Sequence, residues 1–205
     1  MKFTQIPTDT FQKLQLNAGI LASDFTPSTG SITPANILGA TTGGLTFTAT
    51  PSFVDWGDDI DNCPKNMMEL KKLESWEAKL SGKFVTMSTT LAKQILGAAD
   101  IDGTDTTKVV PRNDLATTDF DDVWFIGDYS DKTGDTNGGF IAIHMSNALS
   151  TGGFQIKTED KEKGQFNFEF TAHYSNSTPT TVPFEIYIKA GTAEGATGAT
   201  GVTGA

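Results

Sequence analysis

One stretch of the chain has carboxylates at the spacing that begins a calcium-binding loop. Residues 100–105 read DIDGTD, with aspartates at the first, third and sixth places. An EF-hand loop needs glycine at its sixth place, for a sharp turn, and a bidentate glutamate at its twelfth. Here Asp105 stands sixth and Pro111 stands twelfth. We therefore expect no calcium site in this stretch.

The other residues that could do chemistry are few and scattered. His144 and His173 fall on separate expected strands without CxxC-type partners, so zinc has little support. Cys63 is the only cysteine, which excludes an intrachain disulfide and fits a reducing cytoplasm. The chain has no G-x-S-x-G elbow, no P-loop and no dinucleotide fingerprint. We expect no catalytic residues, no cofactor and no metal, hence no enzyme.

The charge of the chain bears on its partners. The 25 acidic residues outnumber the 15 basic ones, giving a net charge of −10, and Arg112 is the only arginine. Arginine forks dominate the reading of phosphates and base edges, so this composition argues against a protein that grips DNA. The N-terminus shows no apolar signal region and no later run is long enough to span a membrane, so no membrane partner is expected.

Strand patterns dominate the rest of the sequence. Apolar and polar residues alternate along residues 13–21, 45–54, 74–84 and 165–175, the period of a half-buried strand. Shorter strands are expected at 123–126, 140–145, 154–158 and 184–188. One helix is expected, with the hydroxyls of Ser88, Thr89 and Thr90 available to cap its start and an apolar stripe at spacing four made of Leu91, Ile95 and Ala99. This pattern predicts a mainly β fold, a sandwich or partial barrel with one flanking helix.

The remaining segments are expected to connect these elements. Residues 22–43 are rich in Gly, Pro, Ser and Thr and read as one long connection, while residues 55–72 form an acidic segment. Loops of such length in a compact domain are usually functional. We expect one domain over residues 1–190. Residues 191–205 carry glycine at every third place and read as a short, flexible, collagen-like tail.

Taken in order, the chain resembles a major tail tube protein of long-tailed bacteriophages. The stretches that carry the resemblance are FQKLQLNAGILASDFTPSTG, SWEAKLSGKFVTMSTTLAKQILGAAD and GQFNFEFTAHYSNSTPTTVPFEIYI. The resemblance implies six copies per ring and rings stacked into a tube that conducts DNA at ejection, with sheets joining between subunits into a continuous inner barrel. The partners would be further copies of the chain and other tail proteins such as the tape measure and the terminator. The chain would be made in the host cytoplasm and would reside in the virion tail.

Within that architecture, the sequence proposes positions for three sets of residues. A DNA conduit should avoid phosphate traps, so polar strand faces are the candidates for the lumen. The lumen candidates are Thr46, Thr48, Thr50, Glu77, Lys79, Ser81, Lys83, Gln165, Asn167, Glu169 and Thr171. The candidates for contacts between rings are Ile32, Ile37, Leu38, Asp58, Asp59, Asp61, Lys65, Lys71 and Lys72. The residues expected to dock the helix are Leu91, Ile95 and Ala99.

Two other classes of function stay open at this point. A capsid-decoration or host-surface binding module would also be β-rich, acidic and collagen-tailed, and it would be a monomer or a trimer. A carbohydrate-active enzyme would need two carboxylates that face each other across a groove.

Overall fold

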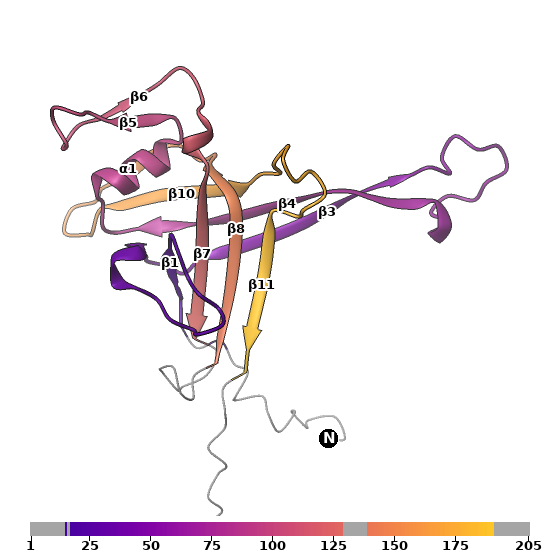
Figure 1. The fold of residues 1–205 in the computed structure, drawn as a ribbon, viewed down its shortest axis with the longest axis horizontal. Helices are drawn as coiled ribbons and strands as arrows, with labels where there is room; N and C mark the ends of the chain where they lie inside the picture. Colours follow the sequence, from indigo (N-terminus) through magenta and orange to yellow (C-terminus); the bar gives the residue numbers. More distant parts are fainter. Residues whose placement is uncertain (1–14, 16, 129–138, 191–205) are drawn as a thin grey trace, which may run out of the picture. The chain divides into compact units, whose positions relative to one another are not determined.

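The computed structural model describes residue 15, residues 17–128 and residues 139–190, and strands dominate these parts. The expected mainly β fold with one α-helix is confirmed, and the described strands do not close into a barrel. The elements in chain order (Figure 1) are β1 (Ile20–Ala22), η2 (Pro34–Asn36), β2 (Ile37–Gly39), β3 (Thr46–Asp55), η3 (Met68–Leu70), β4 (Lys71–Phe84), α1 (Thr89–Leu96), β5 (Ala99–Ile101), β6 (Val109–Pro111), η4 (Thr117–Asp119), β7 (Asp121–Asp128), β8 (Phe140–Ser150), β9 (Gln155–Lys157), β10 (Gln165–Ala172) and β11 (Phe184–Lys189).

The chain groups into two compact units, and β7, β8 and β11 each contribute residues to both. Unit 1 takes its described residues from 1–38, 124–144 and 186–205, and unit 2 consists of residues 39–123 and 145–185. The collagen-like tail expected at 191–205 lies outside the described residues.

Unit 1 is a small sheet over an aromatic cluster. Its strands run in the order β2-β1-β7-β8, with β11 paired to β8. Strand β1 is antiparallel to β7, with Leu21 opposite Phe125. Phe25 packs edge-on against Trp124 and Phe140, with ring centroids 5.6 and 5.2 Å apart. Aromatic pairs of this geometry stabilise a core beyond the area they bury, which suits a unit with few buried residues.

Two expectations for the N-terminal part need correction. The strand expected at residues 13–21 is confined to Ile20–Ala22 among the described residues. The segment expected as one long connection contains η2 and β2, and the Ser23 amide donates to the Asn36 carbonyl at 2.8 Å. Phe25 anchors this segment because its ring is only 4 % exposed. A connection without regular structure was therefore the wrong prediction.

In unit 2 antiparallel strands run in the order β8-β10-β4-β3, and β9 adds to β10. The alternation of β4 and β10 is confirmed, because one face buries Ala78, Leu80, Phe84, Phe168 and Phe170. Gly82 lies opposite Phe168, and a Cβ there would come 3.0 Å from that ring. The missing side chain therefore makes room for Phe168 between the strands.

The helix α1 covers part of this apolar face. Ser88 caps its start by accepting a hydrogen bond from the Leu91 amide at 3.1 Å, as the sequence suggests. Leu91 and Ile95 are buried, and Leu91 lies close to Phe84 around Gly39. The expectation for Ala99 is wrong in one respect, because the helix ends at Gly97 (φ +77°) and Ala99 belongs to β5. No helix in the described part of the chain is long and apolar enough to cross a membrane.

Candidate assembly surface

The three polar strand faces expected to line the lumen lie on one continuous face of unit 2. Register places Thr48 opposite Lys79, and Lys79 opposite Thr171. Directly opposed residues of an antiparallel pair point to the same side of the sheet, so all eleven candidates share the face opposite the buried one. The bulge between Ser52 and Phe53 lies beyond the last of these positions on β3. We call this surface the polar face.

Charges on the polar face are mostly balanced locally. Lys79 Nζ lies 2.6 Å from Glu77 Oε1, and this carboxylate, with a smaller contribution from Glu169, raises the pKa of Lys79. The Thr151 hydroxyl donates to Glu169 at 3.1 Å and lies 2.9 Å from the Thr171 hydroxyl. Two carboxylates therefore lie near Lys79. For Lys83, the other lysine among the lumen candidates, the described residues offer no ion-pair partner.

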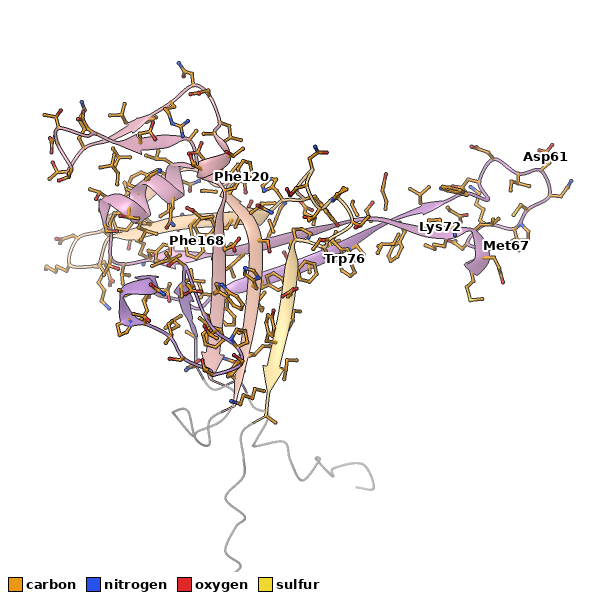
Figure 2. All side chains as sticks on the ribbon, viewed as in Figure 1. Asp61, Met67, Lys72, Trp76, Phe120 and Phe168 are labelled. Carbon is orange, nitrogen blue, oxygen red and sulfur yellow. The ribbon has the colours of Figure 1, made fainter. Side chains whose placement is uncertain are left out.

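The second notable surface is the far part of the β3–β4 hairpin, residues 52–75, which we call the arm. Figure 1 shows this hairpin extending well past β10 within unit 2. Strand β10 pairs with β4 only from Lys79 to Phe84, so beyond Ala78 the arm is a two-stranded ribbon. Figure 2 places Trp76 near the base of the arm and Asp61 and Met67 near its tip. The polar alternation was predicted from the sequence, but its projection as an arm was not.

Aromatic contacts fix the base of the arm. Trp76 and Phe47 each pack edge-on against Phe184, with ring centroids 5.6 and 5.8 Å apart. The Tyr174 hydroxyl accepts a hydrogen bond from the Trp76 amide at 2.9 Å, which satisfies one donor on the open edge of β4. The ribbon is thus held firmly where it leaves the sheet.

The tip of the arm is closed by one carboxylate. Asp55 accepts hydrogen bonds from the amides of Gly57 at 2.9 Å and Asn66 at 2.8 Å. These two bonds, from Gly57 first, lower the pKa of the Asp55 carboxyl. The segment expected as an acidic connection is therefore an ordered loop that continues the hairpin.

Large apolar side chains of the arm are open to solvent. Trp56 is 65 % exposed and Met68 is 81 % exposed. The full set is Phe53, Trp56, Ile60, Met67, Met68 and Leu73. Phe53 was expected to point inward, and it does not because the arm extends past the strands that would cover it. Several exposed apolar side chains on one projecting element are typical of an interaction site.

The residues proposed for contacts between rings separate into two groups. Ile32 packs against the aromatic cluster of unit 1 and Leu38 is half-buried, while Ile37 is 38 % exposed. Ile32 therefore contributes to the core of unit 1, and Ile37 stays accessible to a partner. The structure brings together the remaining candidates on the arm, which are Asp58, Asp59, Asp61, Lys65, Lys71 and Lys72. All six are exposed.

Arg112 is the centre of an ion-pair cluster in unit 2 that sequence reasoning missed. Its Nε lies 2.9 Å from an Asp100 oxygen, and its Nη2 pairs with the fully buried carboxylate of Asp119. Asp119 also accepts a hydrogen bond from the Ala116 amide at 2.8 Å. Burial raises the pKa of Asp119, but the Ala116 bond and the Arg112 pair outweigh it and leave the pKa below its usual value. The cluster ties the β5–β6 hairpin to the turn before β7.

The cavities of the described residues are shallow and poor in catalytic groups. A hydroxyl-rich one in unit 1 contains Asp24 as its single carboxylate, and one in unit 2 contains Glu169. No group of three or more His, Cys, Asp or Glu residues in the described ranges could hold a metal ion. His144 stacks on Trp124 at 4.1 Å and His173 packs on Phe120 at 5.3 Å, so both contribute to packing. No known family model and no curated protein matches the chain.

Proposed function

We propose that this chain is a structural virion protein, the tail tube protein of a long-tailed bacteriophage. Copies form hexameric rings, and the rings stack into a tube that conducts DNA during ejection. The number six, the virion tail and the partner tail proteins follow from the resemblance of the three sequence stretches. The surfaces of unit 2 support a self-assembling protein independently of it.

The proposal of self-assembly rests mainly on the arm. A two-stranded ribbon is marginal in water without a covering layer, and both of its edges present unpaired backbone groups. The arm adds exposed Trp56, Met68 and Leu73 to these open edges. A further copy of the chain that covers this ribbon would bury both the apolar side chains and the edges. An exposed arm of this kind suits a subunit whose working state is an assembly.

The polar face supports the proposed role of the chain as the wall of a DNA conduit. In the proposed tube it lines the lumen, where it presents hydroxyls, amides and Lys79 paired with Glu77. The Lys79–Glu77 pair leaves little free positive charge to hold a phosphate. DNA would then slide along this face without a specific contact. The sheets of neighbouring subunits would join into the continuous inner barrel, which removes their exposed edges.

The test is size-exclusion chromatography with negative-stain microscopy of the purified chain. Stacked sixfold rings are the expected result. Trimers would favour the decoration or host-binding module, and a monomer with a cleft would favour the enzyme. A variant replaces residues 53–74 with Asn-Gly, because Ser52 and Ser75 are directly opposed and a two-residue turn can join them. This variant should fold and form no tubes. Tubes of normal length from it would refute the role of the arm.

A further inference from the structure

Lys83 lies on the polar face without a carboxylate partner. Lys79, two residues earlier on the same face, pairs with Glu77, and Lys157 of β9 pairs with Glu159 at 2.6 Å. For Lys83, no ion pair with another described residue exists. An unpaired ammonium on the wall of a DNA conduit would bind the phosphates of the passing DNA and slow it. In the assembly this charge therefore needs a matching anion.

A cavity of about 420 Å³ lies beside Lys83, and its polar groups are suited to an anion. Gly43 and Gly44 line it, and within the described part of the chain their amides donate no hydrogen bond. Hydroxyls of Thr42, Thr46 and Ser81 line it as well, and none of them is hydrogen-bonded to another described residue. No carboxylate lines the cavity. One cation and several free donors therefore surround a space that can accept anionic oxygens.

The matching anions lie at the tip of the arm. Asp58, Asp59 and Asp61 are exposed, and none pairs with a lysine or arginine among the described residues. Strand β4 separates the two sites, since it runs from Lys71 at the arm to Lys83 at the cavity. At about 3.3 Å per residue this separation is about 40 Å, several times the Debye length at physiological salt. The tip of one chain cannot reach its own Lys83.

We propose that the acidic tip of one copy docks in the Lys83 cavity of the next copy, head to tail. The inference rests on the proposed self-assembly and names the acceptor for the arm. A contact between two different surfaces of identical subunits extends into an open stack when its rotation does not close a ring, and we propose the open form here. It also neutralises Lys83, because carboxylates of the neighbour occupy the cavity that a DNA phosphate would otherwise enter.

A charge-swap experiment on the full chain tests the docking. One variant carries Lys83→Glu, and another carries Asp58→Lys, Asp59→Lys and Asp61→Lys together. Each alone should assemble more weakly, by about fivefold per contact, the upper range for an exposed ion pair. A mixture of the two should assemble, because every tip then meets a cavity of opposite charge. Lys157→Glu, a matched charge change on the same face, should assemble like the unmodified chain.

The readouts are sedimentation velocity at several salt concentrations and thermal unfolding of each variant to show that it folds. Normal assembly of the Lys83→Glu variant would overturn the docking and leave the proposed function intact. Failure of the folded mixture to assemble would overturn it as well. If the unmodified chain forms no tubes, the proposed function itself fails. The unmodified chain could also bind a DNA oligonucleotide. If Lys83→Glu abolishes that binding and leaves assembly unchanged, the cavity binds phosphate and the proposal is refuted.

Discussion

Trp56 offers the sharpest test of the idea that the arm is buried in the assembly. A tryptophan side chain presents at most about 250 Å², so with 65 % exposure about 160 Å² of it is open to solvent in one chain. At about 25 cal/mol per Å², complete coverage of that area would contribute about 4 kcal/mol. If a neighbour covers half of it, Trp56→Ser should weaken each contact by about 2 kcal/mol, or about thirtyfold in the association constant.

The assay is sedimentation velocity over a range of protein concentrations, with the midpoint of assembly compared between variants. Leu115→Ser is the matched control, because Leu115 is 53 % exposed in unit 2 and lies outside the arm. The free energy of unfolding of the Trp56→Ser subunit should change by no more than about 0.5 kcal/mol, since the side chain is exposed in the subunit. An unchanged assembly midpoint in the folded variant would show that no neighbour covers Trp56, and the reasoning about the arm would fail.

Three further predictions concern the stability of unit 2. Because Ile95 is fully buried, Ile95→Asp should give unfolded or insoluble protein, and Ile95→Ala should lower the free energy of unfolding by about 2–5 kcal/mol in chemical denaturation. The control Thr90→Asp changes an exposed residue of the same helix and should be neutral. A soluble, stable Ile95→Asp variant would show that α1 does not pack as described. Ser88→Ala should lower the free energy of unfolding by about 1 kcal/mol, because the helix cap is lost. An unchanged free energy of unfolding would mean that the Leu91 amide finds another acceptor. The pKa of Asp119 is lower in the folded state than in the unfolded state. The ionised carboxylate therefore contributes fully to folding stability above the unfolded-state pKa of about 3.9, and this contribution is lost as the pH falls through the folded-state pKa. The difference in melting temperature between Asp119→Asn and the unmodified chain should therefore be largest near neutral pH and shrink below about pH 4, and a difference that is constant with pH would contradict this account.

Deletion of Ser28–Ala40, within the segment that the sequence predicted as a long connection, is a poor test of assembly. The deletion would remove η2 and β2, and with them Ile32 from the aromatic cluster. It would also remove the hydrogen bond in which the Thr86 hydroxyl accepts from the Ala40 amide at 2.9 Å. We expect this variant to fold poorly, so it would not report on assembly. Substitutions on the arm are the better test.

Local periodicity was enough to predict the long strands β3, β4 and β10 and the buried residues of the helix. The alternation along β3, β4 and β10 shows which residues share a side, because successive side chains of a strand point in opposite directions. The hydroxyl of Ser88 and the apolar spacing of Leu91 and Ile95 likewise predicted the helix start and its buried stripe. Such signals are contained in neighbouring residues and need no knowledge of the fold. They do not tell which strands become neighbours.

Contacts between distant residues were decided by the tertiary structure alone. Ala99 continues the helical spacing by sequence, yet the left-handed backbone at Gly97 ends α1 before it. Phe53 continues the apolar alternation of β3, yet it is exposed because β10 does not extend that far along the hairpin. Only the register of β3, β4 and β10 brings the three polar stretches onto one face and places Glu169 of β10 near Lys79 of β4. A periodic sequence records the direction in which each side chain points, whereas what lies opposite that side chain depends on residues far away in the chain.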